Sequence, residues 1–255
     1  MALVFLDVDG TLLNHRTKKI SSKNLEAIKL LKKNNHQVVI CTGRVPRVLK
    51  DLTEKTTVEN FVCANGKVVI FNGEIIFKEY IPSDLVEEVV EYCKKEELDI
   101  SIANETDYVV IDDSFGKMKP FLDVFNITGV LVDPEYHKTH NVLQLNICDN
   151  SKVEKLRERF PMLEFIYSNQ YGLDVNLKTG LKELGAEKLM EYLNVNEDEV
   201  YVFGDGLNDV GMMKLVKHSV AMGNAFDECK KYSSFVTLSI DFDGVYWGLK
   251  YFDLI

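Results

Sequence analysis

The stretch Leu3-Val4-Phe5-Leu6-Asp7-Val8-Asp9-Gly10-Thr11 joins an apolar run to two carboxylates, a glycine and a hydroxyl. Residues 3–8 predict a strand that is covered on both faces, as in a parallel sheet. Side chains alternate along an extended chain, so Asp7 and Asp9 are expected on one side. Parallel α/β proteins bind ligands where their strands end, so these carboxylates indicate one part of a site. An Asp-Gly hairpin turn is the alternative, which the apolar strand before the acids disfavours.

Both ends of the chain alternate apolar strands with amphipathic helices. This order predicts right-handed crossovers and a doubly wound, Rossmann-like parallel α/β sheet. Beyond residues 3–8, the predicted strands are 37–41, 60–64, 199–203, 219–222 and 234–238. The predicted helices begin at a Ser21-Ser22 cap, at about Arg44 and after Asn208, and a further helix covers 181–193.

The middle of the chain has a different pattern. Asn72-Gly73 between two apolar runs predicts a hairpin, and Pro82 opens a predicted helix. The further predicted strands are 100–103, 108–111, 142–147, 163–168 and 171–176, with helices near 115–125 and 151–160. We interpret this pattern as an α+β insert. The predicted division is a core domain of 1–80 plus 176–255 and a cap domain of 81–175.

Bulk composition excludes several classes of protein. With 46% hydrophobic and 27% charged residues, the chain is typical of a globular protein. No stretch approaches the roughly 20 apolar residues of a membrane span. The net charge of −10 argues against a nucleic-acid partner, because Lys/Arg patches hold phosphate backbones. The apolar N-terminus lacks a basic leader and predicts a strand instead of a signal peptide. Five scattered cysteines without CxxC pairing indicate reduced thiols and a cytoplasmic location.

The second polar motif is Thr42-Gly43-Arg44, at the end of the predicted strand 37–41. A hydroxyl and backbone N–H groups at the start of a helix suit a phosphate oxygen. A plain helix cap explains the same residues equally well.

The third motif is Gly204-Asp205-Gly206-Leu207-Asn208-Asp209, again directly after an apolar strand. A purely structural turn is one interpretation. However, gathering Asp7, Asp9, Asp205 and Asp209 at one sheet edge without counter-charge is costly. The cluster therefore predicts a hard divalent cation with oxygen ligands, Mg²⁺ above all.

Together these motifs resemble those of a known superfamily. DxDGT at Asp7–Thr11, TGR at Thr42–Arg44 and GDGxND at Gly204–Asp209 are similar to the signatures of haloacid dehalogenase (HAD) phosphatases. Their order and spacing resemble the Cof-type subfamily, in which a cap domain is inserted between the second and third motifs. The further matches are Asn65-Gly66, Ala221-Met222-Gly223-Asn224-Ala225 and Asp243-Gly244-Val245.

The resemblance implies a role for each matching residue. Asp7 would be the nucleophile that forms an aspartyl-phosphate, and Asp9 would protonate the leaving alcohol and then activate water. Mg²⁺ would be held by the Asp7 carboxylate, the Asp9 main-chain carbonyl and the Asp205 carboxylate, while Asp209 would steady the metal shell or a lysine. Thr42 would bind the transferring phosphoryl group. The substrate contacts implied are Thr11, Gly43, Arg44, Asn65 and Asn208.

One motif departs from the family pattern. The family shows a glycine directly after its catalytic lysine. An ungapped alignment of the following helix puts Lys182 in the lysine position, and Glu183 then stands where the family has that glycine. Lys178 is the rival for the lysine. Placing Leu189, Tyr192 and Leu193 on the core-facing side of helix 181–193 leaves Lys182 in its first turn, and we therefore favour Lys182.

The resulting prediction is a Mg²⁺-dependent phosphatase that hydrolyses a small phosphorylated metabolite, such as a sugar phosphate, without a nucleic-acid or membrane partner. A phosphotransferase or phosphomutase shares the aspartyl-phosphate and differs in the acceptor. A dehalogenase does not need the second acid, Asp9. A P-type pump is excluded by the lack of membrane spans. A catalytically idle metabolite sensor on the same fold is the alternative from a different class, and the complete set of acids disfavours it.

The acidity of the chain is concentrated in the predicted cap. Residues 83–168 contain 18 Asp/Glu and 9 Lys/Arg, a net charge of −9, whereas the rest of the chain has a net charge of −1. Such a charge repels leaving groups that carry further phosphates. This predicts that monophosphates of neutral or amine-bearing metabolites are preferred over bisphosphates. The alternative is a solvated surface without influence on selection.

Overall fold

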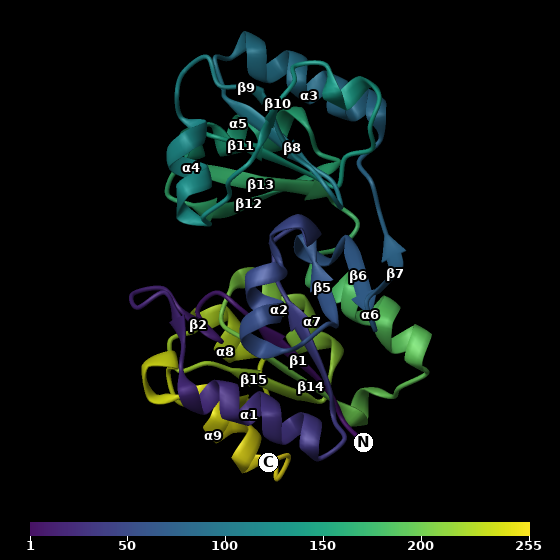
Figure 1. Cartoon of the computed structure of the whole chain (residues 1–255), viewed down its shortest axis with the longest axis vertical. Helices are drawn as coiled ribbons and strands as arrows, with labels where there is room; N and C mark the ends of the chain where they lie inside the picture. Colours follow the sequence, from purple (N-terminus) through teal and green to yellow (C-terminus); the bar gives the residue numbers. More distant parts are fainter. The chain divides into compact units, whose positions relative to one another are not determined.

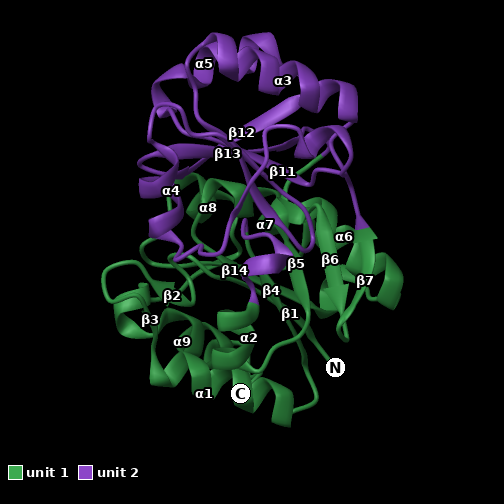
Figure 2. Ribbon diagram, turned by 45° about the horizontal axis from the view of Figure 1, so that its top comes forward, with its two compact units in different colours: residues 1–42, 50–77, 180–255 green, residues 43–49, 78–179 purple.

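The computed structural model describes all residues from Met1 to Ile255 (Figure 1). The chain divides into two compact units (Figure 2). Unit 1 comprises Met1–Thr42, Lys50–Phe77 and Gly180–Ile255. Unit 2 comprises Gly43–Leu49 and Lys78–Thr179. The short segment Gly43–Leu49, which the sequence placed in the core, therefore packs with unit 2.

Unit 1 is built on one eight-stranded sheet in the order β16-β15-β14-β1-β4-β5-β6-β7. Neighbouring strands from β16 to β5 run parallel, and β6 pairs antiparallel with β5. The strands are β1 Leu3–Asp7, β4 Gln37–Cys41, β5 Phe61–Cys63, β6 Val68–Phe71, β7 Glu74–Lys78, β14 Val200–Gly204, β15 His218–Ala221 and β16 Phe235–Val236. A separate two-stranded ribbon pairs β2 Leu13–Asn14 with β3 Lys19–Ile20. The predicted α/β fold class is confirmed.

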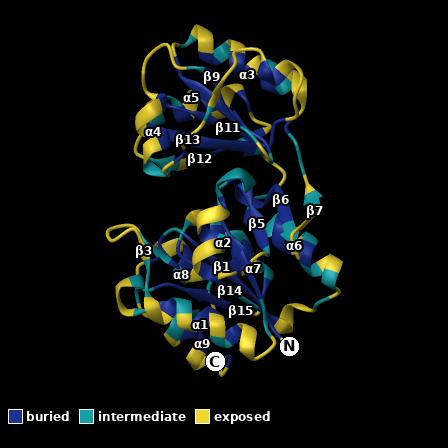
Figure 3. Cartoon of the chain, viewed as in Figure 1, coloured by how far each residue is buried: buried dark blue, intermediate teal, exposed yellow.

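Helices cover the sheet of unit 1 in two groups. Helix α1 contacts α2 and α9, while α7 contacts both α6 and α8. The helices are α1 Ser22–Lys33, α2 Lys50–Thr56, α6 Lys182–Leu193, α7 Val210–Leu215, α8 Asp227–Tyr232 and α9 Gly244–Tyr251. The 3-10 turns are η1 Pro46–Val48, η2 Ala64–Gly66, η5 Glu197–Glu199, η6 Leu207–Asp209 and η7 Ile240–Phe242. Strand β1 is buried along its whole length, as a strand covered on both faces must be (Figure 3).

Local signals explain where several elements begin. The Ser21 hydroxyl accepts a hydrogen bond from the Asn24 N–H at 3.1 Å, which caps α1 as predicted. Asn72 and Gly73 both have positive φ, as the turn of the predicted hairpin requires. The helix predicted from about Arg44 begins later than expected, because Val45 precedes Pro46 and is held extended. The chain turns helical only at Pro46–Val48 and then in α2.

Unit 2 is an α+β body with a six-stranded sheet in the order β10-β9-β8-β11-β13-β12. The strands are β8 Ile100–Ala103, β9 Tyr108–Asp112, β10 Leu131–Val132, β11 Gln144–Ile147, β12 Leu163–Asn169 and β13 Gly172–Leu177. The helices are α3 Ser83–Lys95, α4 Met118–Val124 and α5 Val153–Arg159, with 3-10 turns η3 Tyr136–Lys138 and η4 Asn150–Lys152. Alternate strand residues pack with α3 and α5 in one apolar core. None of the helices in either unit combines the length and apolar character of a membrane span.

Candidate active site

The three polar motifs follow strands that are neighbours in the sheet of unit 1. Strand β1 lies between β14 and β4, and Asp7 is paired in register with Cys41. Asp7 therefore ends β1, Thr42 follows β4 by one residue, and Asp205 follows β14 by one residue. Because the strands are parallel, their carboxyl ends meet at one edge, where ligands bind in this kind of sheet.

A buried lysine lies between two of the acids. The Lys182 ammonium is 2.6 Å from Oδ1 of Asp7 and 2.7 Å from Oδ1 of Asp209. The side chains of Lys182, Asp7 and Asp209 are 2%, 6% and 0% exposed, so these charges are shielded from solvent. Lys182 is the first residue of α6, at the helix end where a cation is unfavourable. The two carboxylates offset that unfavourable position.

Burial and like charges alter the acid–base properties of this group. Burial, followed by the charge of Asp209, raises the pKa of Asp7 well above its usual range, and Lys182 only partly opposes this. Burial and Asp209 likewise raise the pKa of Asp205 to about 6. Burial alone would lower the pKa of Lys182, but Asp209 and Asp7 outweigh it and raise that pKa. The site thus has an excess of negative charge that one lysine does not balance.

Asp209 is held by the turn that follows β14. Its Oδ2 accepts hydrogen bonds from the N–H groups of Asp205 at 3.0 Å and Gly206 at 2.9 Å. A Cβ at Gly204 would lie 2.6 Å from the Asp209 carboxylate, so the carboxylate occupies space that only a glycine leaves open. With Oδ1 on Lys182 and Oδ2 on backbone N–H groups, Asp209 fixes both the lysine and the loop that carries Asp205.

Asp205 is enclosed by the loop after β1. Its Oδ1 accepts a hydrogen bond from the Thr11 hydroxyl at 3.1 Å. Gly10 has a φ of +99°, and a Cβ there would lie 2.1 Å from Oδ2 of Asp205. The Asn224 amide donates to the Gly10 carbonyl at 2.9 Å and to Oδ2 of Asp205 at 3.3 Å. Two distant segments of sequence therefore position the carboxylate.

The other predicted contact residues of unit 1 lie around Thr42. The buried Thr42 N–H donates to the Val62 carbonyl at 2.8 Å, and the Thr42 carbonyl accepts from the Asn65 N–H at 3.2 Å. Asn65 has left-handed backbone angles, and its Oδ1 accepts from the Asn208 amide at 3.1 Å. Thr42 does not begin a helix, because its own N–H donates within the sheet and the first helical residues after it are Pro46–Val48.

Four further residues considered from the sequence are not among the contacts described above. Gly43 and Arg44 belong to unit 2, where the Arg44 guanidinium lies 5.9 Å from the centre of the Phe125 ring. Asp9 lies in the turn after β1, paired as an isolated bridge with Leu13. Lys178 is also in unit 2, with a 60% exposed side chain 3.9 Å from Glu164.

The carboxylates fit a divalent cation. One oxygen each from Asp7, Asp205 and Asp209 can be chosen so that all three lie within 4.8 Å of one another. Carboxylate oxygens are the ligands that Mg²⁺ prefers. Burial, followed by the charge of Asp209, raises the pKa values of Asp7 and Asp205, and a cation would favour their ionised forms. Asp209 is fully buried and accepts from the Lys182 ammonium and from two backbone N–H groups, so it also serves to hold the lysine and the loop.

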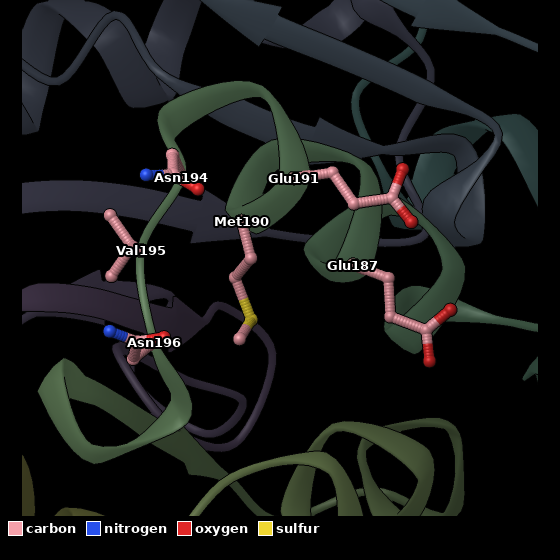
Figure 4. Close-up of a pocket in the computed structure, with 6 residues that line it drawn as sticks. All are labelled: Glu187, Met190, Glu191, Asn194, Val195 and Asn196. Atoms are coloured by element: carbon pink, nitrogen blue, oxygen red, sulfur yellow. The ribbon is translucent and has the colours of Figure 1, made fainter.

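A shallow hollow elsewhere in unit 1 contains none of the predicted site residues. It lies at the C-terminal end of α6, away from Lys182 at the helix start (Figure 4). Its lining residues are Glu187, Met190, Glu191, Asn194, Val195 and Asn196. Its open surface and the lack of convergent polar groups distinguish it from the acidic cluster.

Sequence reasoning missed several residues that shape the site. Asn224 lies in a stretch that matched the family pattern, so it could have been named from that motif. Lys67 is fully buried and donates to the Gly180 carbonyl at 2.8 Å, next to the start of α6. Nothing in the local sequence distinguishes Lys67 from a surface lysine.

The fold and the acidic site define a doubly wound α/β protein with a lysine-paired aspartate at the sheet edge. Residues 4–249 match the haloacid dehalogenase-like hydrolase family, and the chain belongs to that family. It is 28% identical to the Bacillus subtilis protein YkrA, over 99% of this chain and 98% of that one. The B. subtilis 5-amino-6-(5-phospho-D-ribitylamino)uracil phosphatase YwtE is 25% identical over 96% of both chains. A solved sugar phosphatase of HAD subclass IIB covers 100% of both chains, with 25% identity and a TM-score of 0.88. The predicted superfamily and the class of phosphoric monoester hydrolase are confirmed.

Proposed function

We propose that the chain is a Mg²⁺-dependent phosphatase that hydrolyses a small phosphorylated metabolite through an aspartyl-phosphate on Asp7. The observation that carries this proposal is the placement of Asp7. It ends the central strand of the sheet, beside a lysine that favours its ionised form and beside Asp205 and Asp209. A carboxylate that is to attack phosphorus must be ionised and fixed in place. Lys182 fixes Asp7 and partly offsets the burial and the Asp209 charge that raise its pKa, and a bound Mg²⁺ would favour the ionised form further.

The reaction has two displacements. A carboxylate oxygen of Asp7 attacks phosphorus, the bond from phosphorus to the alcohol oxygen breaks, and Asp9 gives its proton to the leaving alkoxide. Water then attacks the phosphorus of the aspartyl-phosphate while Asp9 takes a proton from that water. The Asp7 carboxylate and inorganic phosphate are released. Lys182 holds positive charge beside the reacting oxygen of Asp7, and Thr42 and Asn208 are the proposed contacts of the phosphoryl group.

Asp7, Asp205 and the main-chain carbonyl of Asp9 are the proposed ligands of Mg²⁺. The ion would neutralise charge on the carboxylates and on the phosphate ester, which is most of what phosphoryl transfer requires. Asp209 is assigned to Lys182 and to the Asp205 loop, because its two oxygens are engaged there. Thr11 is proposed to steady Asp205 through its hydroxyl.

We propose that unit 2, the predicted cap, selects the leaving group. The face of its sheet opposite the apolar core carries a buried chain of polar groups, in which the Tyr108 hydroxyl donates to Asn146 and Asn146 donates to Asp174 at 2.8 Å. Arg44 and Gly43 also belong to this unit. Hydroxyl and amide groups suit a neutral, hydrogen-bonding leaving group such as a sugar or polyol. The two substrate classes named for the relatives, a sugar phosphate and a ribityl phosphate, are therefore the first to test. Five buried free thiols support a cytoplasmic location.

The experiment is a metabolite phosphate panel that includes sugar, polyol and nucleotide monophosphates and bisphosphates. Phosphate release is measured in Mg²⁺, in Ca²⁺ and after exhaustive EDTA dialysis. Mg²⁺ should support turnover and Ca²⁺ should not, because the larger and looser calcium shell disturbs in-line geometry. Acid quenching during turnover should leave phosphate on the peptide that contains Asp7. Full activity in EDTA, or phosphate on no aspartate, would refute the mechanism, and products formed with a competing alcohol would identify a transferase.

A further inference from the structure

The residue that departs from the family pattern has a defined position in unit 1. Glu183 follows Lys182 directly in the first turn of α6. Its Oε1 accepts a hydrogen bond from the Leu181 N–H at 2.9 Å, which satisfies a donor that the helix itself leaves unpaired. A carboxylate is also favoured at the positive end of the helix dipole, where Lys182 is not. Glu183 therefore stabilises the turn that Lys182 needs in order to reach Asp7.

The other oxygen of Glu183 lies against α7. A Cβ at Gly211 would lie 2.2 Å from Oε2 and 2.3 Å from Cδ of Glu183. Glycine is the poorest helix former after proline, so its presence inside α7 needs a reason, and the room it leaves for Glu183 is one. Oε2 is buried and accepts no hydrogen bond from the protein. Contact with water therefore does not explain the orientation of the Glu183 side chain, whereas its close packing on Gly211 does.

The same turn is held from a second direction. A Cβ at Gly66 would lie 2.0 Å from the Leu181 carbonyl, and a Cβ at Gly185 would lie 2.6 Å from the Val62 side chain. The buried Lys67 ammonium donates to the Gly180 carbonyl at 2.8 Å. Turn η2 thus packs on one side of the α6 start, and Glu183 on Gly211 packs on the other. Lys182 lies between Leu181 and Glu183 in the chain, so both sets of contacts restrain the backbone that carries it.

We propose that Glu183, seated against Gly211, is a positioning residue that directs Lys182 toward Asp7 and Asp209. Its catalytic consequence rests on the proposed function, in which Lys182 acts at the phosphoryl group. The geometric part, the direction of Lys182, is independent of that function. A glutamate here takes the place of the glycine that the family pattern shows, and Gly211 supplies the space that the larger residue requires.

The test compares Glu183→Ala, Glu183→Gln, Gly211→Ala and the double variant Glu183→Ala/Gly211→Ala. Glu187→Gln is the matched control, because Glu187 is an exposed glutamate one turn further along the same helix (Figure 4). The first readout is the side-chain ¹⁵N NMR signal of the Lys182 ammonium, assigned by its loss in Lys182→Gln. Ammonium protons that donate to buried carboxylates exchange slowly with water, so this signal stays visible. The second readout is kcat and KM for para-nitrophenyl phosphate.

We expect Glu183→Ala and Gly211→Ala to shift or erase the Lys182 signal and to lower kcat roughly tenfold to a hundredfold, as misplaced catalytic groups do. KM should change little. Glu183→Gln keeps the acceptor and should stay within a few-fold of wild type, as should Glu187→Gln. The double variant should be no worse than Glu183→Ala, because the added methyl enters emptied space and the two effects do not add.

Several results would overturn the proposal. An unchanged Lys182 signal in both Glu183→Ala and Gly211→Ala is one, and additive losses in the double variant are another. If Glu187→Gln changed the Lys182 signal and kcat as much as Glu183→Ala does, the loss of a negative charge on α6 would explain the effect without any positioning role. If Glu183→Ala fails to fold, Gly211→Ala carries the comparison. A moved Lys182 signal in a protein that hydrolyses no phosphate ester would keep the positioning role and refute the proposed function.

Discussion

The ammonium nitrogen of Lys182 lies 2.6 Å from Oδ1 of Asp7, although 175 positions separate the two residues in the sequence. The pair joins the start of α6 to the end of β1, inside a site where both side chains are shielded from water. A buried charge is tolerated only when it is paired. The pair therefore fixes Asp7 in place and partly offsets the burial and the Asp209 charge that raise its pKa. It also makes Asp7 and Lys182 depend on each other.

Lys182→Ala should lower kcat by roughly a hundredfold or more, on the scale of about 3 kcal/mol for a lost preorganised electrostatic contact. Its removal also leaves Asp7 and Asp209 buried without a cation, which favours protonation of the nucleophile. Lys178→Ala is the matched control and should stay within a few-fold of wild type, because its side chain is 60% exposed. Steady-state kinetics of both variants decide the assignment. A crippled Lys178→Ala beside a nearly normal Lys182→Ala would reverse it.

Asp7→Asn should abolish turnover and stabilise the metal-free protein. The amide is nearly isosteric but a far poorer nucleophile, so the covalent route closes. Burial and Asp209 disfavour the ionised form of Asp7, and a neutral amide removes that repulsion. Thermal melts in EDTA should therefore show a higher Tm than wild type. An Asn variant that keeps more than a few per cent of the wild-type rate, with contamination excluded, is incompatible with Asp7 as the nucleophile.

The sequence predicted the sheet and its polar edge well, because both follow from local rules. Asp7 and Asp205 each come directly after an apolar run, and parallel strands end at one edge. The helix expected from about Arg44 begins later, because the restriction that Pro46 imposes on Val45 outweighs the helical pattern that follows. The packing of Gly43–Leu49 with unit 2 depends on tertiary contacts, such as those of Arg47 with the Thr128 and Gly129 carbonyls. No local pattern encodes them.

Helix α6 shows where apolar periodicity fails. Tyr192, expected on the buried face, is 61% exposed. The buried residues of α6 are Lys182, Gly185, Ala186 and Leu189. Lys182 is buried because it pairs with two carboxylates, and Gly185 is buried because α6 lies close to η2. Neither contact depends on hydrophobicity. The apolar pattern of α6 therefore favoured Lys182 although it placed Tyr192 on the wrong face of the helix. The family alignment supported the same lysine.

The stability of the metal-free protein should fall as the pH rises through about 6. The pKa of Asp205 is raised to about 6 in the folded state, against about 3.9 in an unfolded chain. A raised folded-state pKa contributes stability that is complete below the unfolded value and lost as the pH rises through the folded one. In EDTA, wild type should lose Tm relative to Asp205→Asn between about pH 4 and pH 6.5, the range set by the two pKa values. Saturating Mg²⁺ should remove this loss, since a cation favours the carboxylate. If the Tm of wild type and that of Asp205→Asn changed equally with pH in EDTA, the raised pKa of Asp205 would be wrong.

Asn224→Ala should weaken Mg²⁺ binding more than it slows chemistry. The Asn224 amide donates to the Gly10 carbonyl at 2.9 Å and to Oδ2 of Asp205 at 3.3 Å, and its Oδ1 accepts from the Ile240 N–H at 2.8 Å. Side chains that orient a metal ligand typically contribute tenfold to a hundredfold in metal affinity or activity. We therefore expect the Mg²⁺ concentration for half-maximal activity to rise by roughly tenfold, while kcat at saturating Mg²⁺ stays within a few-fold of wild type.

The control for Asn224 is Asn14→Ala. Asn14 also joins this part of the chain to the segment near Ile240, through an exposed hydrogen bond of 2.7 Å to Asp241, but it does not touch Asp205. Its loss should leave the Mg²⁺ requirement unchanged, because an exposed pair is readily replaced by water. Mg²⁺ titrations of activity, together with the Mg²⁺-induced rise in Tm, separate the two variants. An equal shift in both would mean that the loop as a whole was loosened. An unchanged Mg²⁺ requirement in Asn224→Ala would mean that Thr11 and Gly10 suffice to orient Asp205.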